Sequence, residues 1–290
     1  MGGPPAVIER LRAQLAQRMS RLALLAAAAD QHRGATPDLS GTIEFETSFA
    51  TLYLEESDTV ITPGLTAIGE WEPGLTAYFG ANLKPGQVFV DLGAHVGYFT
   101  CLAARMVGPR GLVVAFEPSP RNYELLLANV WRNGLTNVVC FPWAVSDHNG
   151  FADLYLSDTN TGDNRLVGSG RSVPVRTVAL DSLEVLRPPV DVIKADVQGA
   201  EERAFRGAEQ LLAASPDVLV VTEFSVAEAT AAGSDPRALL DYYRSLGFGV
   251  RALHPEEKDL QELSDDEILA HCAGNGGTLH TNLMLSRSPR

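Results

Sequence analysis

Short apolar runs alternate with amphipathic stretches along most of the chain. The runs QVFVDL, LVVAF, NVVCF, VDVIKAD and DVLVVTEF predict buried strands, and the stretches after four of them predict helices at about 98–107, 120–133, 200–213 and 236–246. Two further strands, FGVRAL and the alternating TLHTNLMLS, follow. Strands separated by helices indicate a parallel, doubly wound α/β sheet, which binds its ligand beyond the carboxyl ends of the strands.

Two segments fall outside this alternation. Ile8, Leu11, Leu15, Met19 and Leu22 recur at helical spacing, so residues 1–40 are expected to form an N-terminal helical extension. Residues 41–290 then form one domain, with its cofactor half at about 71–150 and a substrate-side β-hairpin insertion at about 151–180. The apolar run LALLAAAA is too short to span a membrane and lies behind a long polar stretch, so we expect neither an export signal nor a membrane partner.

Composition and charge narrow the function classes. With 45% hydrophobic and 20% charged residues, the sequence is that of a globular protein and not of a disordered one. The 290 residues carry 36 acidic and 23 basic side chains, and the net charge of −13 counts against binding to nucleic-acid backbones. Three isolated cysteines form neither a zinc motif nor a disulfide framework, which indicates a reducing, cytoplasmic location.

The turn after the first of these strands, VDLGAHVGYFT, carries a specific chemical signal. Dinucleotide-binding folds have G-x-G-x-x-G here, and the second glycine lets the backbone approach a pyrophosphate. In this chain His95 stands two residues after Gly93 and would crowd a phosphate, and no Lys or Arg occurs between positions 87 and 104. The strand closes on an acid, Asp91. Such a turn suits a cationic nucleoside that has no phosphate.

A second acid supports a nucleoside ligand. Glu117 closes the next strand in FEPSP, where dinucleotide folds place the carboxylate that accepts hydrogen bonds from ribose hydroxyls. Either acid alone could merely cap a helix, but two acids at successive strand ends with a glycine turn between them favour binding. S-adenosylmethionine combines an adenosine, a sulfonium and an amino acid without a phosphate, so it fits these features, with S-adenosylhomocysteine as the product.

Seven segments together resemble one family in order and spacing: VFVDLGAHVGYFT, VVAFEPSPRNYELLLANVWRNGL, WAVSD, NTGDNRL, VPVRTVALDSL, DVIKADVQGAEERAFRGAEQLL and VLVVTEFS. They resemble the FkbM-type S-adenosylmethionine-dependent methyltransferase family over residues 71–224. The resemblance implies the class I methyltransferase fold, a Rossmann-like seven-stranded sheet whose last strand is antiparallel. It also implies methylation, mostly of hydroxyl oxygens in sugars, polyketides and other secondary metabolites.

The resemblance also implies site residues. The first turn would hold the methionine part of the cofactor through Asp91, Gly93, Ala94, His95, Gly97 and Tyr98. Glu117 with Pro118 would lie at the ribose, Ala144 and Val145 at the adenine, Asp196 beside the sulfonium, and Glu72 in the lead-in that covers the cofactor. The family usually has Asn in place of His95 and Glu in place of Gln198. The second departure removes a carboxylate that could have been the base, so a cofactor-binding protein without turnover stays an alternative.

Methyl transfer to a hydroxyl needs in-line positioning and a group that takes the proton. Asp196, Glu223 and His254 are the catalytic candidates, and Asp196 comes first because its strand adjoins the cofactor turn. A purely structural contact of Asp196 with the cofactor is the alternative. A lone histidine such as His254 or His280 is more often structural. Phe224 and Ser225 stand where catechol-type enzymes have an Asp-Asn pair, so no metal is expected.

The acceptor stays open at this level. Residues 158–165 of the insertion, rich in Asn, Asp and Thr, could form a substrate lid or a solvated hairpin tip. We expect a small hydroxylated metabolite and no nucleic acid as the partner. N- or carboxyl-methylation, RNA methylation and a nicotinamide-dependent oxidoreductase remain alternatives, because fold does not determine the acceptor. The N-terminal helix could also form the contact of a homodimer.

Overall fold

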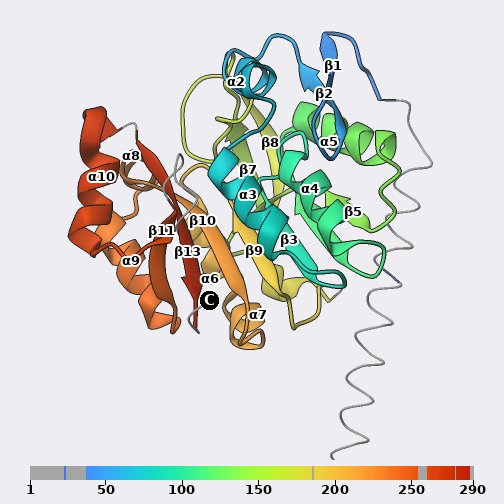
Figure 1. Ribbon diagram of the computed structural model, residues 1–290. Helices are drawn as coiled ribbons and strands as arrows, with labels where there is room; N and C mark the ends of the chain where they lie inside the picture. Colours follow the sequence, from blue (N-terminus) through green and yellow to red (C-terminus); the bar gives the residue numbers. More distant parts are fainter. Residues whose placement is uncertain (1–22, 24–36, 185, 254–259, 278, 288–290) are drawn as a thin grey trace, which may run out of the picture.

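The computed structural model describes residues 23, 37–184, 186–253, 260–277 and 279–287 (Figure 1). The predicted N-terminal helix falls almost entirely outside these residues. Most of the described residues pack around one large sheet.

The central sheet has the strand order β12-β11-β13-β10-β9-β3-β4-β5. Five strands are mutually parallel: β3 (Val88–Leu92), β4 (Leu112–Phe116), β5 (Val138–Phe141), β9 (Val192–Ala195) and β10 (Leu219–Ser225). β13 (His280–Ser286) runs antiparallel between β10 and β11 (Gly249–Leu253), and the two-residue β12 (Leu260–Gln261) lies at the edge. Apart from this short edge strand, the sheet has seven strands with the last one antiparallel. The predicted class I methyltransferase fold is therefore confirmed.

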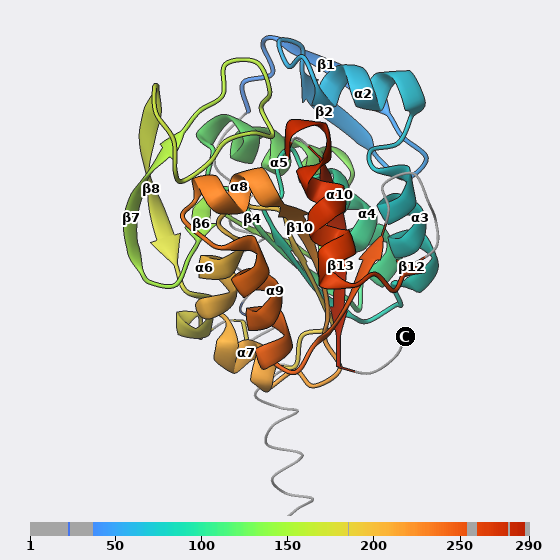
Figure 2. The ribbon, with the colours of Figure 1, turned by 90° about the vertical axis from the view of Figure 1, so that its left-hand side faces the viewer.

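Helices cover both faces of this sheet (Figures 1 and 2). One face carries α3 (Pro73–Asn82), α4 (Tyr98–Val107) and α5 (Pro120–Arg132). The other carries α6 (Glu201–Arg206), α7 (Glu209–Ala213), α8 (Val226–Ala231), α9 (Pro236–Ser245) and α10 (Asp265–Gly277). Neighbouring β3 residues show the consequence, since Phe89 packs into one apolar core and Val90 into the other. Burial on both faces explains why these strands are continuous apolar runs in the sequence.

The lead-in before α3 is fastened to the cofactor half of the sheet. It consists of the hairpin β1 (Thr42–Glu46) and β2 (Thr51–Glu55) and of helix α2 (Ile61–Ile68). Asn129 in α5 binds the backbone of Tyr53 in both directions, at 2.6 and 3.1 Å, and Arg121 forms a 2.7 Å ion pair with Glu55. These contacts hold the lead-in against α5, on the side of the molecule where the parallel strands end (Figure 1).

The predicted insertion is a β-hairpin with a long connection. β7 (Gly150–Tyr155) and β8 (Ser172–Val178) pair antiparallel, and β6 (Trp143–Val145) adds to β8 in parallel. Residues 156–171 join the two hairpin strands and reach the lead-in, where the Thr59 backbone N–H donates to the Thr159 carbonyl at 2.8 Å. The short 3-10 turn at Leu180–Ser182 then leads back to β9.

The helix predicted over 200–213 is two helices, α6 and α7. The break falls at Gly207, where an added Cβ would lie 2.0 Å from the Ser146 carbonyl oxygen. The Asp181 carboxylate starts the second helix by accepting hydrogen bonds from the backbone N–H groups of Gln210 and Leu211, at 2.9 and 2.8 Å. The start of α7 therefore depends on Asp181, which is distant in the sequence, and helical spacing alone does not predict it.

Glu201 at the start of α6 is expected to make stability depend on pH. The carboxyl is buried, it accepts a 3.0 Å hydrogen bond from the Val197 N–H, and burial raises its pKa to about 8. Between the ordinary glutamate pKa and about 8 the folded protein holds a proton that the unfolded chain releases, so stability falls as pH rises through this window. Glu201→Gln should therefore stabilise the protein by roughly 1–3 kcal/mol at pH 8 and by less near pH 5.

Chemical denaturation at both pH values measures this difference. Glu184→Gln is the matched control, since Glu184 is exposed and should change stability by less than about 0.5 kcal/mol. An equal effect of Glu201→Gln at pH 5 and pH 8 would contradict the assignment.

The described part of the chain includes all three cysteines, and each is a thiol buried in the core. Among the described helices, none combines the length and apolar character that crossing a membrane requires.

Candidate functional site

The turn between β3 and α4 is held in place by its glycine and by β4. Gly93 has φ 77° and lies so close to β9 that an added Cβ would be 1.8 Å from the Asp196 carbonyl oxygen. The backbone N–H groups of Gly93 and Ala94 both donate to the Phe116 carbonyl at 3.0 Å. His95 follows with a left-handed φ of 51°, which histidine tolerates better than most residues. The turn thus presents its residues at the carboxyl edge of the sheet.

Two buried acids flank this turn. Glu117 accepts the His95 backbone N–H on Oε2 and the Ser119 N–H on Oε1, both at 2.8 Å, and burial raises its pKa to about 7. Asp91 is fully buried, and its Oδ2 accepts the Thr100 hydroxyl at 2.6 Å. Its Oδ1 has no hydrogen-bond partner among the described residues, and burial raises the pKa of this carboxyl. Both acids can therefore still accept hydrogen bonds from a ligand.

β9 brings a buried ion pair to the same edge. Lys194 Nζ lies 3.2 Å from Asp196 Oδ2. Burial disfavours the Lys194 ammonium, but the carboxylates of Asp196, Asp91 and Glu72 outweigh burial and raise its pKa. Burial likewise opposes ionisation of Asp196, yet Lys194 keeps the pKa of Asp196 below its usual value. Both groups are therefore charged, because the charge of each one offsets the cost of burying the other.

Gln198 links the ends of two strands. Its Nε2 donates to Asp196 Oδ1 at 2.8 Å and to Glu223 Oε2 at 3.0 Å. A carboxylate at this position would supply no N–H, so the amide lets two acids approach that would otherwise repel each other. Burial, followed by the neighbouring carboxylates of Asp196 and Glu228, raises the pKa of Glu223 well above its usual value.

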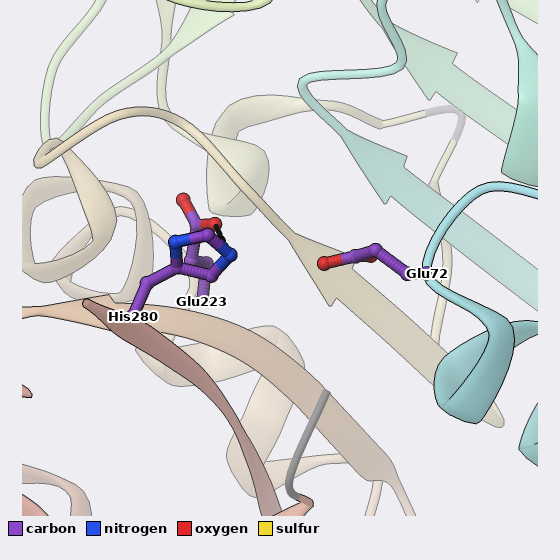
Figure 3. Close-up of side chains that lie close together, drawn as sticks. All are labelled: Glu72, Glu223 and His280. Carbon is purple, nitrogen blue, oxygen red and sulfur yellow. Dashed lines mark ion pairs between the residues drawn. The ribbon is translucent and has the colours of Figure 1, made fainter. Parts of the chain in front are cut away.

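Glu223 also faces two residues from distant segments (Figure 3). His280 on β13 places Nε2 3.6 Å from Glu223 Oε1, and Glu72 points into the space before them from the start of α3. One ligand atom of each residue lies within 4.8 Å of the other two, a donor set of two carboxylates and an imidazole that could hold a divalent cation. Glu72 Oε1 also accepts a 3.2 Å hydrogen bond from Asn282. The remaining catalytic candidate, His254, lies outside the described residues.

One cavity of about 610 Å³ joins these groups. Its lining includes most of the residues that the sequence singled out: Glu72, Asp91, Gly93, Ala94, His95, Tyr98, Glu117, Pro118, Ala144, Val145, Asp196 and Glu223. Gly97 is not part of the lining. It has φ 89° at the start of α4, and an added Cβ would meet Leu126 Cδ1 at 2.6 Å, so its role is in helix packing.

The cavity is strongly acidic. Seven acids line it: Glu72, Asp91, Glu117, Asp163, Asp196, Glu223 and Glu228. The two basic side chains among the described lining residues already contact acids, Lys194 as given above and Arg165 with Asp163 and, at 3.8 Å, with Glu228. Burial raises the pKa of Asp91, Glu117 and Glu223, and a bound cation would favour their ionised forms. A cationic ligand is therefore favoured over an anionic one. Aromatic rings of Phe116 and Trp143 form part of the wall.

The sequence missed Lys194 and the insertion's contact with the turn. The sequence did contain an indication of the role of Lys194, because a lone charged residue in an otherwise apolar buried strand needs a partner of opposite charge. Residues 160–165 line the cavity, as the lid interpretation requires, but many of their polar groups bind one another or the lead-in. Thr161 also contacts His95, which no spacing in the sequence indicates.

Comparisons with known proteins show which family this chain belongs to. The model of the Methyltransferase FkbM domain matches residues 91–250. A ribosomal RNA large subunit methyltransferase E from Acinetobacter baumannii is 32% identical over 128 residues, which are 43% of this chain and 59% of that protein. Methyltransferase sdnD from Sordaria araneosa is 26% identical over 165 residues, 45% of this chain and 63% of that protein. The chain thus spans about three fifths of the length of these relatives.

A solved structure of a TehB-like SAM-dependent methyltransferase from Corynebacterium glutamicum is 13% identical, with a TM-score of 0.45 over 78% of this chain and 94% of that chain. The match to the family model covers more than half of the chain and confirms the resemblance found in the sequence. This chain belongs to the FkbM methyltransferase domain family.

Proposed function

We propose that the protein is an S-adenosylmethionine-dependent methyltransferase that acts on a hydroxyl oxygen of a small polar metabolite, such as a sugar, a polyketide or another secondary metabolite. One observation carries the proposal. A single acidic cavity joins the turn with Asp91 and Glu117 to the linked carboxyls of Asp196 and Glu223. The proposed nucleoside site and the proposed proton-accepting site thereby share one cavity.

The residues present fit the cofactor that the family uses. S-adenosylmethionine is a cationic nucleoside, and the cavity offers an excess of acids and a buried carboxylate oxygen, Asp91 Oδ1, that lacks a partner among the described residues. A cavity of about 610 Å³ falls in the range of small-ligand sites. When bound, the cofactor supplies an electrophilic methyl group on sulfur.

The division of labour among the lining residues follows the resemblance. Asp91, Gly93, Ala94, His95 and Tyr98 would hold the methionine part, Glu117 and Pro118 the ribose, Ala144 and Val145 the adenine, with Glu72 covering the site. Each oxygen of Glu117 accepts one backbone N–H, and the Asn122 side chain also bonds this carboxyl, so a carboxylate with four lone-pair sites still has acceptor capacity for the ribose.

Glu223 is the base that the geometry favours. Asp196, the first choice from the sequence, has one oxygen bound to Gln198 and the other to Lys194, and its pKa is lowered. Glu223 is 11% exposed, its Oε2 accepts from Gln198, and its Oε1 lies 3.6 Å from His280 Nε2. A cationic cofactor bound nearby would favour the ionised form of Glu223. In that form, a carboxylate whose pKa is raised takes a proton from an acceptor hydroxyl more readily than an ordinary one. Asp196 would instead stabilise positive charge near the transferring methyl group.

Turnover of two variants tests these roles. Glu223→Gln should lower methyl transfer about 10²- to 10⁴-fold and leave affinity for S-adenosylhomocysteine within about threefold. Asp196→Asn should lower both the rate of methyl transfer and the affinity for S-adenosylhomocysteine, because it removes a negative charge beside the bound cofactor. Formation of S-adenosylhomocysteine over a panel of hydroxyl, amine, carboxyl and RNA acceptors measures turnover, and calorimetry with S-adenosylmethionine, S-adenosylhomocysteine and NAD measures binding.

Each alternative function has its own outcome in this experiment. Binding of S-adenosylmethionine without methyl transfer to any acceptor would favour a cofactor-binding protein. Binding of NAD would favour a nicotinamide-dependent oxidoreductase. Transfer to RNA would match the name of the Acinetobacter relative, although a net charge of −13 opposes that acceptor. We also propose that residues 41–290 act as one domain. We further propose that the protein works in a reducing cytoplasm, which the three buried thiols support.

A further inference from the structure

His95, Thr161 and Asp58 form a chain of hydrogen bonds between three distant segments. His95 belongs to the turn after β3, Thr161 to the connection between β7 and β8, and Asp58 to the link between β2 and α2. His95 Nε2 lies 2.8 Å from Thr161 Oγ1, and Thr161 Oγ1 lies 2.6 Å from Asp58 Oδ2. The chain therefore ties the insertion and the lead-in to the first turn.

Asp58 acts only as an acceptor in this chain. Its Oδ2 accepts the backbone N–H of Thr161 at 2.6 Å, and its Oδ1 accepts those of Val60 and Thr62 at the start of α2, at 2.9 and 3.1 Å. Partial burial opposes ionisation, but these hydrogen bonds outweigh it and hold the pKa of Asp58 below its usual value. An ionised carboxylate has no proton to donate.

The direction of the remaining bonds follows. The single hydroxyl proton of Thr161 points to Asp58, so Thr161 Oγ1 can only accept from His95, and Nε2 must carry a proton. Burial lowers the pKa of His95 to about 4, so its ring is neutral and Nδ1 has a free lone pair. Nδ1 has no hydrogen-bond partner among the described residues, and His95 lines the cavity.

We propose that the insertion fixes His95 as the Nε2–H tautomer, so that Nδ1 accepts a hydrogen bond from the ammonium group on the amino acid end of the cofactor. This inference rests on the proposed function. An ammonium group has three N–H donors and no acceptor, so it matches a ring nitrogen held in the lone-pair state. The insertion thereby becomes part of the cofactor site. In the sequence it lies between β6 and β9, far from the turn after β3 that carries His95.

A matched pair of variants separates the two ring nitrogens. His95→Asn keeps an acceptor near the position of Nδ1 and loses the group at Nε2, and asparagine tolerates the left-handed backbone of this position. His95→Gln places its amide near Nε2 and has no acceptor near Nδ1. We expect affinity for S-adenosylhomocysteine to stay within about threefold in His95→Asn and to fall about tenfold in His95→Gln.

5′-Methylthioadenosine lacks the amino acid end and serves as the internal control. Its affinity should stay within about twofold in both variants, which also shows that the site is folded. Equal losses of S-adenosylhomocysteine affinity in the two variants, or parallel losses for both ligands, would overturn the inference. Failure of the wild-type protein to bind any adenosyl ligand would instead overturn the proposed function.

Nitrogen-15 NMR of the His95 ring reads the tautomer directly, without a ligand. We expect one tautomer, protonated at Nε2, in the wild-type protein and a mixture in Thr161→Val, which lacks the hydroxyl. Thr159→Val is the control on the same connection, since Thr159 is exposed and uses only its backbone carbonyl to bind Thr59. A ring protonated at Nδ1 in the wild-type protein would overturn the inference.

Discussion

Gly93→Ala is expected to abolish binding of S-adenosylmethionine and S-adenosylhomocysteine. The new Cβ would lie 1.8 Å from the Asp196 carbonyl oxygen, and that atom is backbone at the end of a central strand, so no side-chain rotation can relieve the contact. Alanine is also strained at φ 77°. The two effects should destabilise the fold by roughly 3 kcal/mol or more and push the turn and β9 apart. Calorimetric titration and chemical denaturation measure the two losses.

Gly207→Ala is the control that distinguishes a general loss of stability from a specific loss of the cofactor site. Its Cβ would lie 2.0 Å from the Ser146 carbonyl oxygen, which is also backbone, but Gly207 does not line the cavity. This variant should lose comparable stability and keep affinity within about threefold under conditions where it is folded. If Gly93→Ala bound the adenosyl ligands as tightly as Gly207→Ala, the turn would not be the cofactor site.

Glu117→Ala is expected to lower affinity for S-adenosylhomocysteine at least about 100-fold. Two charge-assisted hydrogen bonds to ribose hydroxyls would contribute about 3 kcal/mol together, and their loss corresponds to this factor. The backbone N–H groups of His95 and Ser119 would also lose their acceptor, which loosens the turn. Glu117→Gln keeps one acceptor oxygen, but its amide N–H group would face one of these two backbone N–H donors. We therefore expect affinity for S-adenosylhomocysteine to fall about tenfold.

The pH dependence of binding gives this prediction a second measurement. In the free protein the pKa of Glu117 is about 7, so a sizeable fraction is protonated at neutral pH. Hydroxyl donors stabilise the ionised form and lower this pKa on binding, so affinity should rise with pH between about 6 and 8 and binding at pH 7 should release protons. Calorimetry in buffers of different ionisation enthalpy detects the release. Proton uptake, or the same release in Glu117→Gln, would contradict the role of Glu117.

Much of the fold is predictable because its strands are buried on both faces. Phe89 and Val90 belong to opposite cores, so the strand must be apolar throughout and is easily found. The acids at the strand ends were predictable for a related reason, since the carboxyl ends of parallel strands meet at one edge. Asp91, Glu117 and Asp196 accordingly line one cavity.

Contacts made by irregular segments were not predictable. Thr161 reaches His95 from a long connection whose path depends on Asp58 and not on any periodicity. Gln198 looked like a missing carboxylate in the sequence, whereas its amide joins Asp196 to Glu223. The chemistry of this residue depends on which atoms surround it, and only three-dimensional placement supplies them.

The position of β13 has a consequence for how the protein forms during synthesis. β13 follows every other strand of the sheet in sequence, yet it pairs with β10 on one side and β11 on the other. Until it leaves the ribosome, both of these strands expose unpaired backbone edges with apolar side chains, a state that invites pairing with other chains. Synthesis thus leaves a gap inside the nascent sheet, and cooperative folding of this half must wait for the strand that fills it.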